Sequence, residues 1–136
     1  MYETDVYPRP AQLPDPSPDL SPREVVMIQL EALQNNDLYA QNGGIRRVFD
    51  YASPGNRSFT GPVERFIELV KNPLYKPLIG FQRATIGGIL ILGDHAQVRV
   101  ELVDAQGKSV RYVWSLSRQA EMPYANCWMT DGVMLG

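Results

Sequence analysis

Apolar residues recur at every third or fourth position in three stretches between residues 21 and 72, the spacing typical of amphipathic helices. The first stretch opens with Ser21-Pro22-Arg23-Glu24, a capping box with proline at the first helical position, and is predicted to continue to about Asn36. Its buried stripe is predicted to comprise Val26, Leu30 and Leu33, with Met27 beside them.

Two further helices are predicted downstream. One covers residues 42–52, and the other opens at Thr60-Gly61-Pro62 and ends at Asn72-Pro73, because proline disfavours the helical conformation of the residue before it. Between them, residues 53–56 read Ser-Pro-Gly-Asn, a composition typical of a turn. Three helices are therefore expected before residue 77.

After Pro77 the apolar period changes from 3.6 to 2, which indicates strands. Glycine-containing turns divide this half of the chain into an antiparallel meander of four long strands, predicted at residues 81–92, 95–104, 108–118 and 124–133. The pair Gly87-Gly88 inside the first strand predicts a bulge or a sharp bend. The fold class is therefore α+β, with three N-terminal helices packed on a curved four-stranded antiparallel sheet.

The turn at residues 105–107 allows a prediction of strand register. A three-residue loop with glycine in the left-handed position pairs Asp104 with Lys108. This register gathers the apolar residues of both strands on one face and sets Glu101 opposite Arg111 on the other. The apolar pairs that it predicts are Val98 with Trp114, Val100 with Tyr112, and Leu102 with Val110.

Six of the 11 prolines fall within the first 22 residues, so residues 1–20 are not expected to form a helix or an interior strand. This segment is interpreted as a proline-rich flexible arm, and residues 21–136 as the folded domain. Two roles stay open for the arm: a leader without function, or a segment that docks Tyr2 and Tyr7 onto a partner or onto its own domain.

Composition excludes several classes of function. A net charge of −2 gives no footprint for nucleic acid or an anionic membrane surface. No apolar run has the roughly 20 residues of a membrane helix, and the first ten residues contain no apolar core of a secretory signal. One cysteine and one histidine make a poor metal set, so we expect neither a metal nor another cofactor, and a cytoplasmic location.

Neither of the two most reactive residue types makes a strong catalytic candidate. His95 adjoins the Gly93-Asp94 turn and is expected to be an exposed hairpin residue. Cys127 lies in a predicted strand and is expected to be a core thiol rather than a nucleophile. The sequence also contains no phosphate loop, zinc-ligand spacing or Gly-x-Ser-x-Gly elbow.

Asp131 stands in a largely apolar predicted strand, where an ionised carboxylate needs a partner. Arg57 is the expected partner, in a bond that would clamp the last strand to the helices. The alternative is that Asp131 and Arg57 help to grip a carboxylate or phosphate ligand.

Aromatic residues in neighbouring predicted strands are expected to face the hollow of the curved sheet. They either pack the core or a dimer face, or they enclose a flat apolar ligand that an arginine orients. The candidate pocket residues are Arg57, Arg65, Phe66, Tyr112, Trp114, Trp128 and Asp131.

Three sequence segments carry a resemblance to a known family: Tyr51-Ala52-Ser53-Pro54-Gly55-Asn56-Arg57, then Thr60-Gly61-Pro62 with Arg65-Phe66, and Cys127-Trp128-Met129-Thr130-Asp131-Gly132-Val133. Over about residues 20–134 the chain resembles the uncharacterised family called domain of unknown function 4864. The predicted order of elements is similar to that of nuclear transport factor two-like (SnoaL-like) proteins, which implies a cone-shaped fold. That superfamily includes isomerases, dehydratases, cyclases, transport adaptors and assembly modules, so the resemblance implies no single activity.

Three functional hypotheses remain. The first is a non-enzymatic module that binds a protein partner or assembles as a homodimer. The second is a binder of a small apolar or carboxylate ligand in the cone. The third is an acid–base enzyme of the isomerase or dehydratase type. An empty pocket beside the aromatic residues favours the last two, and a filled core favours the first.

Overall fold

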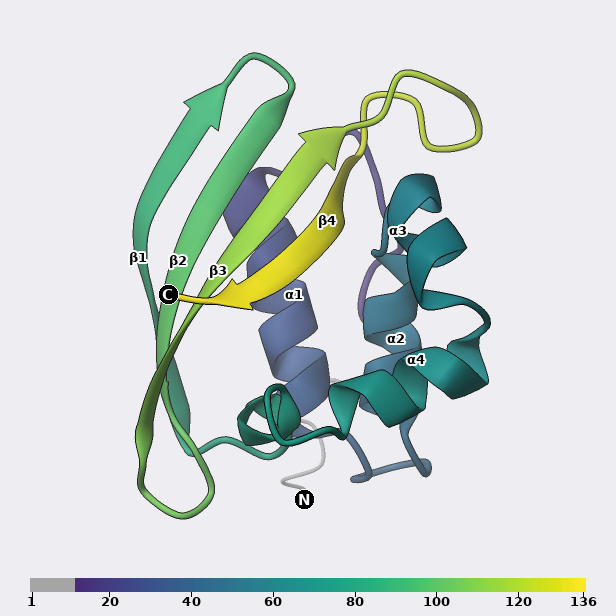
Figure 1. The fold of residues 1–136 in the computed structure, drawn as a ribbon. Coiled ribbons are helices and arrows are strands. Elements are labelled where there is room, and N and C mark those ends of the chain that lie inside the picture. The colour runs from purple at the N-terminus through teal and green to yellow at the C-terminus, as the bar shows by residue number, and fades with distance from the viewer. Residues whose placement is uncertain (1–11) are drawn as a thin grey trace.

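The computed structural model describes residues 12–136 and consists of helices on one side of a curved sheet (Figure 1). The helical elements are α1 (Pro22–Gln34), α2 (Gly43–Asp50), α3 (Pro54–Thr60), α4 (Val63–Val70) and the short 3₁₀ helix η3 (Lys76–Leu78). The strands are β1 (Arg83–Leu92), β2 (His95–Val103), β3 (Ser109–Arg118) and β4 (Trp128–Leu135), hydrogen-bonded in that order. The α+β class and the four-stranded antiparallel meander are confirmed.

Helix α1 begins at the capping box that the sequence predicts. The Glu24 amide donates to Ser21 Oγ at 3.2 Å, and the Ser21 amide donates to Glu24 Oε1 at 2.9 Å. Val26, Leu30 and Leu33 are buried as expected, whereas Met27 is 42% exposed. The prediction for Met27 is wrong because the buried face of α1 extends in the other direction, through Val25, Ile28, Gln29 and Ala32.

The predicted count of three α-helices is wrong, because the expected turn at residues 53–56 is the start of α3. Ser53 caps this helix by accepting from the Asn56 amide at 3.2 Å, and Pro54 takes the first helical position. Serine followed by proline starts α1 in the same way, but no residue of α3 is buried, so no apolar stripe marks the helix in the sequence.

Helices α1 and α2 approach each other closely at Gly44. The Gly44 amide donates to the Asn36 carbonyl at 3.0 Å, and Asn36 Oδ1 accepts from the Ile45 amide at 2.8 Å. Asn36 and Ile45 are both buried. The first turn of α2 is thereby attached to the residues that follow α1.

The β2–β3 register is the predicted one. Asp104 N donates to Lys108 O at 2.8 Å, Gly107 has a φ of 87°, and all three apolar pairs form as expected. Glu101 lies opposite Arg111 and forms an exposed ion pair at 3.4 Å. The bulge at Gly87-Gly88 is also confirmed, since the β1–β2 pairing shifts between Ile86 and Ile89.

The last strand begins later than predicted, at Trp128 rather than at Tyr124. Residues 119–127 form a loop that closes on itself through two backbone hydrogen bonds, from Gln119 N to Cys127 O and from Asn126 N to Gln119 O. Asn126 adopts a φ of 67°, which turns the chain and cannot belong to a regular strand.

Residues 13–15 pack against α2. The Leu13 side chain is buried, and its carbonyl accepts from the Arg47 guanidinium. The Tyr51 hydroxyl donates to the Pro14 carbonyl, and Arg47 pairs with Asp15 at 2.7 Å. Tyr2 and Tyr7, the residues that the sequence analysis considers for docking, lie outside the described residues.

Deletion of residues 1–20 is therefore expected to lower the melting temperature by about 5–10 °C, because it removes Leu13 from the core and leaves Arg47 without Asp15. Deletion of residues 1–11 is the matched control. It retains each of these contacts, so its melting temperature is expected to lie well above that of the longer deletion. Equal melting temperatures for the full chain and the longer deletion, measured by circular dichroism, would contradict the docking of residues 13–15.

Candidate functional site

A cavity of about 310 Å³ lies between the helices and the β3–β4 half of the sheet. Most of the side chains around it are apolar, and the lining residues come from α1, α2, α3, α4, η3, β3 and β4 and from the segments that join them. Apolar lining residues include Leu33, Val48, Phe66, Val70, Leu78 and Val133. The hollow that the sequence predicts is thus open beside Trp114 rather than completely filled.

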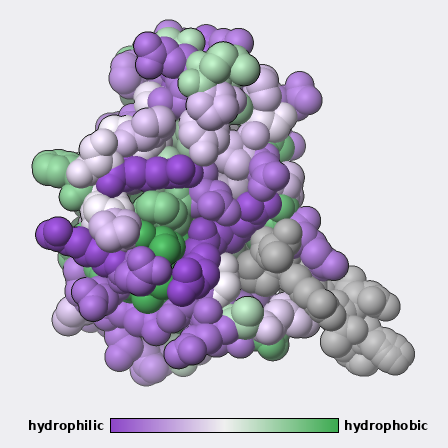
Figure 2. Space-filling model, turned by 90° about the vertical axis from the view of Figure 1, so that its right-hand side faces the viewer, coloured by the Kyte–Doolittle hydropathy of each residue, from purple (hydrophilic) through white to green (hydrophobic). Residues whose placement is uncertain are grey.

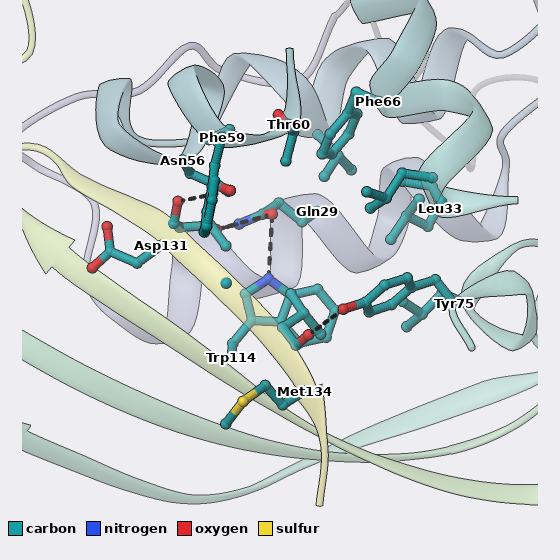
Figure 3. A pocket seen from close by; sticks show the side chains of 18 residues that line it. Gln29, Leu33, Asn56, Phe59, Thr60, Phe66, Tyr75, Trp114, Asp131 and Met134 are labelled. Carbon is teal, nitrogen blue, oxygen red and sulfur yellow. Dashed lines mark hydrogen bonds between the residues drawn. The ribbon is translucent and has the colours of Figure 1, made fainter. Parts of the chain in front are cut away.

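A hydrogen-bonded group of three buried side chains holds the base of the cavity (Figure 3). Gln29 Nε2 donates to Thr130 Oγ1 at 2.9 Å and to the Val25 carbonyl at 3.2 Å. Gln29 Oε1 accepts from Trp114 Nε1 at 3.3 Å and from the Thr130 hydroxyl at 3.1 Å. Because both ends of the amide are bonded, Gln29 fixes the Trp114 ring without leaving a polar atom for a ligand.

Three more polar side chains line the walls. Asn56 Nδ2 donates to the Thr130 carbonyl at 3.2 Å, and the Tyr75 hydroxyl donates to the Val133 carbonyl at 2.8 Å. The Thr60 hydroxyl is buried and has no hydrogen-bond partner among the described residues. Asn56 and Tyr75 therefore join the helical side to β4 across the cavity.

A bulge in β4 determines which of its residues face the cavity. Leu116 pairs with Thr130 and Ser115 pairs with Gly132, so Asp131 is an extra residue in the strand. Beyond the bulge, Val133 pairs with Trp114 and lines the cavity beside it. Strict alternation from Thr130 would have turned Val133 to the opposite face.

The mouth of the cavity is apolar at several points. Phe59 is 91% exposed, Met134 is 60% exposed and Leu69 is 36% exposed, and all three line the opening. Figure 2, which looks at the side on which α3 and α4 lie, shows green hydrophobic side chains in a hollow bordered by purple hydrophilic ones.

The predicted pairing of Arg57 with Asp131 is wrong. Asp131 is exposed, and Oδ1 accepts from Ser117 Oγ at 2.9 Å. Arg57 instead donates to the Asp50 carbonyl at 2.8 Å, and its guanidinium lies 5.1 Å from the Phe49 ring centroid and 5.5 Å from that of Tyr124. The bulge leaves Asp131 in water, so its carboxylate needs no cation.

The seven sequence-predicted pocket residues separate into two groups. Phe66, Trp114 and Asp131 line the cavity. The other four are not among the residues that line it: Arg57, Arg65, Tyr112 and Trp128.

Besides Arg57, three predicted residues lie outside the cavity lining, and each has a different environment. Tyr112 is buried and its hydroxyl donates to the Leu74 carbonyl at 2.8 Å, and burial raises its pKa to about 12. Trp128 packs under the guanidinium of Arg118, whose Cζ lies 5.5 Å from the ring centroid. Arg65 is exposed on α4.

The chemically reactive residues lie away from the cavity. His95 is exposed at the start of β2, as the sequence predicts. Cys127 is buried, and burial raises the pKa of its thiol, which disfavours the nucleophilic thiolate. Within residues 12–136, no three histidine, cysteine, aspartate or glutamate side chains gather as a metal ion would require.

Most of the polar atoms around the cavity come from five residues that were not predicted from the sequence: Gln29, Asn56, Thr60, Tyr75 and Thr130. Only Gln29 gives a sequence signal, because a polar residue between Val26 and Leu30 on the apolar face of a helix needs a buried partner.

None of the described helices is long and apolar enough to cross a membrane.

Comparison with known families gives one match. The profile of the family described as "Domain of unknown function (DUF4864)" matches residues 18–135, so the chain belongs to this family. A comparison with curated proteins found no match. The family match assigns no activity to the protein, and the cavity is the structural feature that bears most directly on function.

Proposed function

We propose that this member of the family binds a small, largely apolar molecule in the cavity beside Trp114. The observation that carries the proposal is an open space of about 310 Å³ that borders the hydrophobic core at Trp114 and is lined mainly by apolar side chains. Pockets that enclose small molecules are concave, mostly apolar and begin at about 300 Å³. A few fixed polar groups around such a pocket orient the ligand, and Asn56 and Thr60 stand in that position.

The lining favours binding over acid–base catalysis. Asp131 is the one charged residue among those that line the cavity, and it lies at the exposed end of the space. Proton transfer at a reacting centre needs a titratable group positioned against the substrate and tuned toward neutral pH. A binding role requires only the apolar walls and the polar groups that are present.

The test is to fill the cavity from one wall. Val133→Phe places an aromatic ring beside Trp114 and is expected to weaken binding of naphthylmethanol at least about tenfold, because the added ring occupies the ligand's volume. Isothermal titration calorimetry measures the affinity. Native mass spectrometry of freshly purified protein would in addition show a retained natural ligand as added mass.

Val113→Phe is the matched control, because Val113 pairs with Met134 and is not among the residues that line the cavity. Its affinity for naphthylmethanol is expected to equal that of the unaltered protein. Failure of the unaltered protein to bind naphthylmethanol, together with the absence of added mass, would overturn the proposed function.

The finer placement of the fold also belongs to the proposal. A helical layer on a bent four-stranded meander with an open hollow supports a position within the nuclear transport factor two-like superfamily. The described residues form four α-helices where three were expected. The additional helix is α3, which precedes the meander and does not interrupt it. The buried single cysteine fits a reducing, cytoplasmic location.

Self-association through β1 is a second candidate function. The four consecutive apolar residues Ile89, Leu90, Ile91 and Leu92 are 37–67% exposed, and β1 is an edge of the sheet. Edge strands are usually protected by charge, proline or cover, and β4 at the other edge is bridged to Ala52. Antiparallel pairing of β1 with a second copy would bury identical apolar segments about a twofold axis.

Leu90→Lys together with Leu92→Lys is expected to convert such a dimer to a monomer in sedimentation velocity, because like charges would then meet across the axis. A monomer for the unaltered protein at millimolar concentration would reject self-association and leave the ligand-binding proposal unaffected.

A further inference from the structure

The protein itself already uses most hydrogen-bonding groups around the cavity. Gln29 and Thr130 bond to each other, Gln29 Oε1 also accepts from Trp114 Nε1, and the Tyr75 hydroxyl donates to the Val133 carbonyl. A ligand in the cavity could therefore bond only to the polar atoms that have no partner within the protein. The donors and acceptors among these atoms determine which polar group the ligand carries.

The remaining atoms offer more acceptors than donors. Asn56 Nδ2 must point at the Thr130 carbonyl, because a carbonyl only accepts, and this leaves Asn56 Oδ1 free to accept and one Nδ2 hydrogen free to donate. Asp131 uses Oδ1 to accept from Ser117, so its second oxygen is also free to accept. The Thr60 hydroxyl both donates and accepts, and no described residue bonds to it.

The charge at the cavity has one sign. Asp131 contributes a carboxylate at the rim, turned away from Trp114 (Figure 3), and it forms no ion pair with the described residues. The two arginines expected from the sequence to orient an anion do not line the space, and the Arg57 guanidinium is held by the Asp50 carbonyl. A ligand carboxylate would find only the Thr60 hydroxyl and one Asn56 Nδ2 hydrogen as donors, and it would face a like charge at Asp131.

We infer that the ligand is an amine: an apolar body enclosed beside Trp114, with an ammonium group at the mouth that donates to Asn56 Oδ1 and is attracted by the carboxylate charge of Asp131 at the rim. This inference rests on the proposed function and names the chemical class of the ligand. An ammonium group has three donors and no acceptor, and it therefore complements the atoms left free. At the exposed rim the electrostatic preference is modest, as for a surface ion pair.

The experiment compares three probes that share one ring system and differ in the polar end: naphthylmethylamine, naphthylmethanol and naphthoate. Affinities for the unaltered protein are measured by isothermal titration calorimetry at low salt. The amine is expected to bind about fivefold tighter than the alcohol, and the carboxylate about fivefold weaker. Asp131→Asn should reduce the difference in affinity between the amine and the carboxylate.

Glu68→Gln is the matched control, because it removes one exposed carboxylate of α4 that is not among those lining the cavity. It should leave all three affinities as they are. Equal or tighter binding of naphthoate, or an unchanged preference in Asp131→Asn, would overturn the amine inference while naphthylmethanol binding still supported the cavity as a binding site. If none of the three probes binds, the inference fails, and the proposed function fails with it when native mass spectrometry also shows no added mass.

Discussion

Replacing Gly44 by alanine is expected to lower the free energy of unfolding by about 3 kcal/mol or more, which is a large part of the stability of a domain of this size. A Cβ at this position would lie 1.9 Å from the Ala32 carbonyl oxygen and 2.8 Å from the Asn36 Cα. Both are backbone atoms of α1 and the residues after it, so the overlap can be relieved only by moving one helix away from the other. Urea unfolding followed by circular dichroism measures the loss.

Gly55→Ala provides the control for this prediction. Gly55 lies in α3, and a Cβ there would meet no atom within 4 Å, so the better helix propensity of alanine should raise the stability slightly. Gly44 also lies in a helix, and propensity alone would predict the same gain there. A stability for Gly44→Ala equal to or above that of the unaltered protein would show that α1 and α2 do not pack as closely as described.

Truncation of Trp114 to alanine is expected to cost about 3–5 kcal/mol, the usual range for a fully buried large aromatic residue. Trp114 is 1% exposed, pairs with both Val98 and Val133, and donates its indole hydrogen to Gln29. The variant would lose those contacts and enlarge the cavity that Trp114 lines.

Phe59→Ala separates the loss of an aromatic residue from the loss of a buried one. Phe59 also lines the cavity but is 91% exposed, so its truncation should change the free energy of unfolding by less than about 0.5 kcal/mol. If the two truncations had similar effects on the urea midpoint, the Trp114 ring would not be the packed centre that it is described to be.

The local rules that predicted the fold worked where sequence neighbours decide the structure. The capping box at Ser21 and the three-residue loop before Lys108 each involve residues a few positions apart, and both formed as predicted. In the hairpin, one loop length was compatible with an apolar face, so register followed from pattern alone. The helix at Pro54 was missed because none of its residues is buried, so no apolar stripe gives a periodic signal.

The candidate site was less predictable because its contacts join distant parts of the chain. Gln29 and Thr130 are 101 residues apart, and nothing in either local sequence names the other. Arg57 and Asp131 were the natural pair by charge, yet the nearest acceptor for the Arg57 guanidinium is a backbone carbonyl seven residues earlier in the chain. Backbone partners of this kind carry no residue type that a sequence pattern could reveal.

The bulge at Asp131 has a consequence for changes in chain length. Thr130 and Val133 face inward on the two sides of the bulge. Deletion of Asp131 would therefore give a regular strand with the same inward-facing residues and a smaller bend. Insertion of one residue after Gly132 would instead exchange the inward and outward sides of everything that follows. The two variants are therefore expected to differ in their effect on the cavity. The deletion would preserve the wall beside Trp114, whereas the insertion would put a different residue in the place of Val133.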